Sequence, residues 1–254
     1  LRSGRQRDLS RRVMEHKLRS RKNLRMSIVA PSRWLASAAQ KSHLFCEQDI
    51  MVIPNGLNLE SFFPHDRNEA RRILGLPEES LLILFSAFGG VGNWNKGGEL
   101  LSKSLNDLVL RSLGAKVELV IMGEEDSPPA DYFPVPVINL GMIKEDSVKR
   151  SIYSAVDVTA IPSRSESLGY VAIESMACDT PCVAFSVGGI VDVIDHQING
   201  FLATPFSVEN FSDGLELLLT NDDLRLKFSA GARKKVSERF CSLEIARQYV
   251  QLYS

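Results

Sequence analysis

The sequence predicts an α/β fold, in which a Rossmann-like, doubly wound parallel sheet has helices on both faces. Short apolar runs alternate with segments of helical periodicity along most of the 254 residues, as parallel β-α-β units require. The composition, with 44% hydrophobic and 24% charged residues, is that of an ordinary folded chain. The two observations together argue against disorder throughout.

Seven short apolar runs are predicted as strands, and eight segments with apolar residues at helical spacing are predicted as helices. The strands are expected at 26–30, 51–53, 81–87, 117–122, 137–140, 157–161 and 182–185. The helices are expected near 33–41, 68–74, 97–111, 147–154, 168–178, 208–219, 222–239 and 243–252. The longest apolar runs are far shorter than the about 20 residues that cross a bilayer.

The turn after the sixth predicted strand is the most informative segment. The strand ends at Pro162, and the apolar periodicity that follows predicts a helix beginning at Ser167 or Leu168. Free backbone N–H groups and the helix dipole at such an end bind anions. Gly169, in the expected first turn, would let a bulky anion approach the backbone. A phosphate group is the ligand that suits this turn.

Two glutamates, Glu166 and Glu174, stand eight residues apart on either side of this turn. Glu174 lies between Ile173 and Met176 on a helix expected to be largely buried, where a carboxylate needs hydrogen-bond donors. The ordinary alternative, a pair of exposed helix glutamates, therefore suits Glu174 poorly.

A second anion-binding loop is predicted after the strand 81–87. Lys96 stands at the start of the next helix, so its ammonium group and the helix N–H groups point toward the strand ends where open sheets bind ligands. Gly90, in a glycine-rich stretch, would let the loop lie flat against the same anion. The alternative is a solvent-exposed lysine, because a lone glycine-rich loop is weak evidence.

These motifs, in this order, resemble the family 4 retaining glycosyltransferases, which have the GT-B fold. The Glu-x7-Glu spacing is followed by Ala177-Cys-Asp-Thr-Pro181 and Gly188-Gly189. Further matching motifs are Ile53-Pro54-Asn55-Gly56, Lys96-Gly97-Gly98, Leu119-Val-Ile-Met-Gly123, Leu140-Gly141, Pro162-Ser163 and Asn199-Gly200-Phe201-Leu202. The resemblance covers roughly residues 26 to 240.

The resemblance implies a role for each candidate residue. Glu166 would be the catalytic carboxylate beside the transferred sugar, and Glu174 would bind the ribose hydroxyls. Lys96 would clamp the pyrophosphate, and Met142 would cover the nucleobase. The remaining donor-binding candidates are Gly90, Gly123, Arg164, Ser167, Leu168 and Gly169.

Arg164 is a candidate because of a departure from the family pattern. Members usually carry a second basic residue a few positions before the lysine, where this chain has Val91, Asn93 and Asn95. Arg164 is expected to replace that residue from the facing loop. The ordinary alternative is a surface arginine.

The implied activity is retaining transfer of a sugar from a UDP- or GDP-sugar in polysaccharide biosynthesis, with no metal or other cofactor. A non-catalytic module that binds nucleotide sugars or phosphate stays open as the alternative. A sugar-nucleotide epimerase is a more distant one, because it would need more acid-base residues. The sequence has no Walker loop or Gly-x-Ser-x-Gly elbow, which disfavours NTPase and hydrolase functions.

Three units are predicted, with a break at the turn residues Asn55-Gly56. Residues 1–55 resemble a remnant of the N-terminal acceptor domain, 56–240 the nucleotide-sugar-binding domain, and 241–254 a helix that returns to the first domain. A glycan or lipid-linked acceptor would bind through the missing part of the first domain. We therefore expect this chain to transfer little or no sugar alone.

The N-terminus is strongly basic, since residues 1–25 hold ten Lys or Arg against Asp8 and Glu15. The ordinary interpretation is a solvated helix or tail, and the sharper one is peripheral contact with anionic lipid or a phosphorylated acceptor. Nucleic acid is disfavoured, because no aromatic residue is interleaved with these charges. The lack of an apolar signal core favours a cytoplasmic location.

Overall fold

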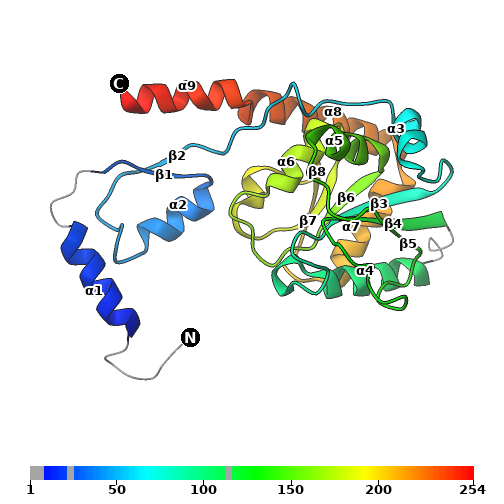
Figure 1. Cartoon of the computed structure of the whole chain (residues 1–254), viewed down its shortest axis with the longest axis horizontal. Coiled ribbons are helices and arrows are strands. Elements are labelled where there is room, and N and C mark those ends of the chain that lie inside the picture. Colours follow the sequence, from blue (N-terminus) through cyan, green and yellow to red (C-terminus); the bar gives the residue numbers. More distant parts are fainter. Residues whose placement is uncertain (1–8, 22–25, 112–115) are drawn as a thin grey trace.

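The computed structural model describes residues 9–21, 26–111 and 116–254. Its main feature is a six-stranded sheet of strand order β5-β4-β3-β6-β7-β8, in which every neighbouring pair is parallel (Figure 1). The strands are β3 (Leu81–Ser86), β4 (Val117–Met122), β5 (Val137–Asn139), β6 (Val158–Ile161), β7 (Cys182–Phe185) and β8 (Gly200–Ala203). The predicted α/β class with a parallel sheet is confirmed.

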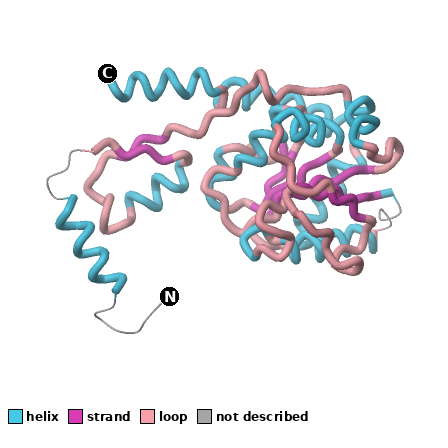
Figure 2. The backbone as a smooth tube through the Cα atoms, viewed as in Figure 1, coloured by secondary structure: helices cyan, strands magenta, loops and turns pink. Residues whose placement is uncertain are grey.

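Helices cover both faces of this sheet. Successive residues of a strand point to opposite faces, so alternate residues are buried under different helices. Leu82 and Leu84 of β3 join one buried apolar cluster, whereas Ile83 and Phe85 join another. The first cluster is covered by α3 (Arg67–Leu74), α5 (Asp146–Ala155), α6 (Tyr170–Ala177) and α8 (Asp222–Arg239), and the second by α4 (Gly98–Leu110) and α7 (Val208–Thr220) (Figures 1 and 2). A central strand buried on both faces has to be apolar throughout.

The N-terminal residues form a smaller unit beside the main sheet (Figure 1). The strands β1 (Ile28–Ala30) and β2 (Ile50–Val52) make a two-stranded parallel sheet, and α2 (Arg33–Gln40) connects them. The helix α1 (Leu9–Arg21) has no buried residue. The C-terminal helix α9 (Ser242–Tyr253) runs from the main unit toward β1 and β2.

Polar contacts made by Ser32 and Arg33 join the small unit to loops of the main one. The Ser32 hydroxyl donates to the carbonyl oxygen of Ser167 at 2.6 Å. The Arg33 guanidinium pairs with Asp192 at 2.8 Å. The division into residues 1–55, 56–240 and 241–254 stays a prediction.

Two predicted features of the fold were wrong. Residues 182–185 are not the last parallel strand, because β8 pairs with β7 beyond them; the turn-forming dipeptide Asn199-Gly200 obscured this four-residue strand. The helix α6 begins at Tyr170 rather than at Ser167 or Leu168. The reason is Gly169, whose φ of 91° lies in the left-handed region, so that it caps the helix instead of joining its first turn.

Candidate functional site

The predicted site lies where two loops leave the carboxyl ends of adjacent central strands. Strands β3 and β6 are parallel neighbours, with Ile83 paired to Val158 and Phe85 to Ala160. After β3 the chain adds β4 on one side, and after β6 it adds β7 on the other. The gap between the two is therefore the switch point of the sheet, where open parallel sheets bind ligands.

Lys96, from the loop after β3, and Glu166, from the loop after β6, meet at this point. The Lys96 Nζ lies 3.3 Å from the Glu166 Oε1, and the two side chains are 21% and 16% exposed. The structure thus brings together two residues that the sequence predicted. A cation beside a carboxylate can stabilise an anionic leaving group and a neighbouring centre of positive charge.

Two glycines allow the loops to pack closely around Glu166. Gly97 has a φ of 71°, and a Cβ atom there would overlap the carbonyl oxygen of Pro162. Gly188 has a φ of 58°, and a Cβ atom there would overlap the carbonyl oxygen of Glu166. The Gly189 N–H donates to that same oxygen at 2.7 Å, so the backbone of Glu166 is held from a third loop.

The glycine-rich loop after β3 is fixed at the end of β4. The Val91 N–H donates to the Glu124 carboxylate at 2.5 Å, and Gly90 beside it has a φ of 96°. Gly123 has a φ of 89°, and a Cβ atom there would lie 3.0 Å from the backbone nitrogen of Phe88. Gly90 and Gly123 therefore shape one loop, and Glu124 is a partner that sequence reasoning missed.

Glu174 lies on α6 in different surroundings, because it is buried and its partner is neutral. The Tyr153 hydroxyl, on α5, donates to its carboxylate at 2.7 Å. Burial raises the pKa of Glu174, and the Tyr153 hydrogen bond and the Lys149 charge offset part of that rise. No hydrogen bond or ion pair within the described part of the chain joins Glu174 to Lys96 or Glu166. Sequence reasoning required a donor here without identifying Tyr153.

The other predicted residues connect or flank these groups. Ser167 and Leu168 link Glu166 to α6, and the Leu168 side chain is buried. Met142 is 37% exposed and follows Gly141, whose φ is 73°. Arg164 forms an ion pair with Glu99, so it is not a freely exposed surface arginine. The donor-binding roles of all these residues stay predictions.

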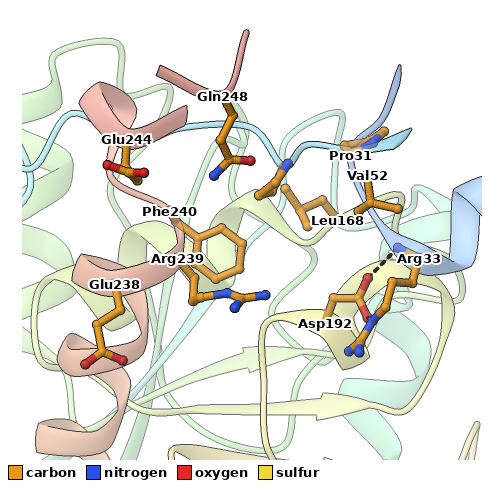
Figure 3. Close-up of a pocket in the computed structure, with 11 residues that line it drawn as sticks. Pro31, Arg33, Val52, Leu168, Asp192, Glu238, Arg239, Phe240, Glu244 and Gln248 are labelled. Carbon is orange, nitrogen blue, oxygen red and sulfur yellow. Dashed lines mark hydrogen bonds and ion pairs between the residues drawn. The ribbon is translucent and has the colours of Figure 1, made fainter. Parts of the chain in front are cut away.

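A cavity of about 460 Å³ lies elsewhere, between the N-terminal unit and the C-terminal helices (Figure 3). Figure 3 shows the Arg33–Asp192 pair at one side of it, while Glu244 and Gln248 approach from α9. Of the predicted site residues, only Leu168 lines this cavity. The cavity is therefore distinct from the Lys96–Glu166 pair.

A buried charged cluster lies at the opposite, amino end of β6. The Asp157 carboxylate is 2.9 Å from Arg71 and 2.8 Å from Arg67, and it accepts the backbone N–H of Leu82 at 2.7 Å. Its place at the edge remote from the switch point indicates a structural role. Among the residues that the structure describes, no group of three His, Cys, Asp or Glu side chains is arranged to hold a metal ion.

Part of the chain matches a known protein family, and most of it aligns with curated proteins. Residues 66–235 match the family described as Glycosyl transferases group 1. An uncharacterized glycosyltransferase of Methanocaldococcus jannaschii is 30% identical over 220 residues, which are 82% of this chain and 54% of the relative. A D-inositol 3-phosphate glycosyltransferase of Xylanimonas cellulosilytica is 34% identical over 221 residues, which are 81% and 51%. The chain spans about half the length of the curated relatives it matches.

Solved structures share the fold. Sucrose-phosphate synthase from Thermosynechococcus elongatus has a TM-score of 0.78 and 26% identity, and the match covers 98% of this chain and 62% of that one. The Anabaena protein HepE, solved in complex with UDP-glucose, has a TM-score of 0.77 and 21% identity, and the match covers 96% and 68%. At that identity the second likeness shows the fold alone.

Proposed function

The chain belongs to the group 1 glycosyl transferases, and we propose that its larger unit binds a nucleoside-diphosphate sugar at the carboxyl ends of β3 and β6. The observation that carries this proposal is the Lys96–Glu166 pair, with its 3.3 Å separation at the switch point of the sheet. The shared fold with HepE, whose structure contains UDP-glucose, supports the same ligand class.

The proposed reaction is substitution at the anomeric carbon with retention of configuration. As the nucleoside diphosphate leaves, negative charge builds on its β-phosphate and positive charge builds on the sugar ring. Lys96 and the N-terminal end of α4 would stabilise the first charge, and the Glu166 carboxylate would stabilise the second. Glu174 would accept hydrogen bonds from the ribose hydroxyls. Retention rests on the family resemblance alone.

The proposed donor is a UDP- or GDP-hexose, and the proposed acceptor is a glycan or a lipid-linked sugar in polysaccharide biosynthesis. We propose no metal or other cofactor for the reaction. The donor-site residues lie in the larger unit, whereas acceptor contacts are expected to come from an N-terminal domain. Negligible transfer by this chain alone therefore stays a prediction.

Calorimetric titration of the purified chain with UDP, GDP, UDP-glucose and GDP-mannose tests donor binding. One of the two nucleotide series is expected to saturate a single site, and the matching nucleoside without phosphate is expected to bind at least about 100-fold more weakly, because the charge-assisted contacts go to the diphosphate. Absence of saturable binding for both series would refute the proposal.

The alternative, a non-catalytic nucleotide-sugar module, predicts the same titration and needs a second assay. A protein in which this chain follows an acceptor domain would be incubated with the donor sugar that binds and with a glycan acceptor. Release of nucleoside diphosphate that depends on the acceptor favours the enzyme. Binding without any release favours the module.

The helix α1 supports a separate proposal of peripheral contact with anionic lipid at the cytoplasmic face of a membrane. It carries basic side chains beside exposed apolar ones, which are Leu9, Val13, Met14 and Leu18. None of the helices in the described ranges is long and apolar enough to span a bilayer. Sedimentation with phosphatidylcholine vesicles, with and without phosphatidylserine, checks the proposal. Binding should require phosphatidylserine and weaken with salt, and equal binding to both vesicles would contradict it.

A further inference from the structure

We infer that Arg164 is a positioning residue, which fixes the segment 93–97 and thereby sets where the Lys96 ammonium group stands. We call this segment the Lys96 loop. The inference rests on the proposed function, because it assigns a task beside the proposed diphosphate site. It replaces the expectation that Arg164 itself contacts the diphosphate.

The backbone of Arg164 and its neighbour already join the two loops at the switch point. The Arg164 N–H donates to the carbonyl oxygen of Asn95 at 2.9 Å. In return, the Asn95 side-chain amide donates to the carbonyl oxygen of Ser165 at 3.1 Å. These reciprocal bonds hold the loop after β6 against the residue that precedes Lys96.

The Arg164 side chain adds two contacts to the Lys96 loop and one to the helix α4 that follows it. Its Nη1 donates to the carbonyl oxygen of Trp94 at 2.9 Å, its Nη2 pairs with Glu99, and its guanidinium carbon lies 4.7 Å from the centre of the Trp94 ring. The planar guanidinium supplies several donors in fixed directions. A lysine at this position could not make these contacts together.

These contacts matter because the Lys96 loop has little structure of its own. It consists of a single 3₁₀ turn, Trp94–Lys96, which Asn93 caps, and such short elements have poor hydrogen-bond geometry. Arg164 binds the carbonyl groups of both residues that directly precede Lys96. The position from which Lys96 reaches Glu166 is therefore set by Arg164.

The cation of Arg164 is engaged and is not directed to a further anion. Its side chain is 16% exposed and its guanidinium pairs with Glu99. The hydrogen bond from Arg164 is the main cause that lowers the pKa of the Glu99 carboxyl group, which keeps that carboxylate ionised and paired. A direct contact with a diphosphate would have to compete with this pair.

A double-mutant cycle tests whether Arg164 acts through Lys96. The affinities of UDP and GDP are measured by calorimetry for the wild type, Arg164→Ala, Lys96→Ala and the double variant. Arg164→Ala is expected to weaken binding about 10-fold and Lys96→Ala about 10- to 100-fold. The double variant should bind as weakly as Lys96→Ala and no weaker. Full additivity of the two losses, or unchanged affinity in Arg164→Ala, would overturn the inference.

Hydrogen exchange gives a second readout that requires no nucleotide. The backbone amides of residues 94–98 should exchange at least about 10-fold faster in Arg164→Ala, and Arg164→Lys should behave similarly because it lacks the fork. Glu99→Gln removes the charge of the residue that pairs with Arg164. The Glu99 side chain is 43% exposed, so this substitution carries little risk to folding. Arg247→Ala removes an arginine–glutamate pair far along the chain and serves as the control.

The two readouts separate the failure of the inference from that of the proposed function. Faster exchange at 94–98 in a chain that binds neither nucleotide would sustain the positioning role and refute the donor site. Unchanged exchange in Arg164→Ala, in a chain that does bind nucleotide, would refute the positioning role alone.

Discussion

Glu166 and Glu174 belong to one motif, yet the regions around them differ in charge and in burial. Glu166 lies 3.3 Å from the Lys96 cation and is 16% exposed. Glu174 is buried, and its described donor is the neutral Tyr153 hydroxyl at 2.7 Å. Burial raises the pKa of Glu174.

The two carboxylates are therefore suited to different partners. Glu166 faces the Lys96 cation and is suited to a neighbouring group that carries changing charge. No cation among the described residues forms an ion pair with Glu174, and a carboxylate has about four acceptor positions. One hydroxyl leaves most of these positions for further donors, such as the two hydroxyls of a ribose.

The largest expected effect comes from the backbone that holds the Glu166 region. Gly188→Ala would place a Cβ atom against the carbonyl oxygen of Glu166 at a residue whose φ is 58°. We expect nucleotide binding to be lost and the melting temperature to fall by several degrees. Thermal unfolding and calorimetry check this. Gly92→Ala is the matched control, because a Cβ atom there meets nothing within 4 Å; equal behaviour of the two variants would contradict the account.

The next effect concerns the Glu174 region. Glu174→Gln keeps the shape and the bond from Tyr153 but removes the charge that would accept the ribose hydroxyls. We expect the affinity for the nucleotide to fall about 10- to 100-fold, while stability at pH 7 is kept or raised because a buried charge is removed. Affinity is measured by calorimetry and stability by urea unfolding. A purely structural glutamate would give the reverse, with lower stability and unchanged affinity.

A smaller effect on the nucleotide is expected from the Glu166 region. Glu166→Gln should leave the affinity for UDP or GDP within about 3-fold of the wild type, because Lys96 keeps its ammonium group. Binding of the sugar nucleotide should weaken more than binding of the bare nucleotide, since the carboxylate is proposed to face the sugar. Paired titrations of both ligands measure this difference. A larger loss for the bare nucleotide would indicate that Glu166 contacts the nucleotide rather than the sugar, which would contradict the proposal.

The smallest effect is a pH dependence that only the Glu174 region should show. Its folded-state pKa is raised above the ordinary value of 4.5, so its contribution to stability is complete below 4.5 and is lost as pH rises through the raised value. The free energy of unfolding of the wild type, relative to Glu174→Gln, should therefore decline as pH rises from about 4.5 to 8. Urea unfolding at several pH values measures the decline, and a flat or rising difference would contradict the raised pKa.

Apart from β8, the described strands and the two facing loops could be predicted from the sequence, because buried parallel strands are continuous apolar runs and the glycines mark their ends. Residues 117–122 and 182–185 are strands with the predicted bounds. Lys96 and Glu166 meet because the strands that precede them, β3 and β6, are parallel neighbours in the sheet. Each of these features depends on local pattern together with one rule of topology.

The side-chain partners could not be predicted, because they come from other elements. The bond from Tyr153 to Glu174 requires α5 and α6 to pack together, and the pairing of Arg164 with Glu99 requires the start of α4 to face the turn after β6. Sequence spacing carries no information on either packing.

Backbone amide NMR of the chain during titration with UDP and with GDP tests most directly where the donor binds. One nucleotide is expected to shift the amides of residues 89–98 and 166–170, and the Lys96→Ala variant is expected to lose these shifts. Saturable shifts confined to Arg33, Asp192 and Arg239, which line the cavity of Figure 3, with the amides near Lys96 unmoved, would contradict it.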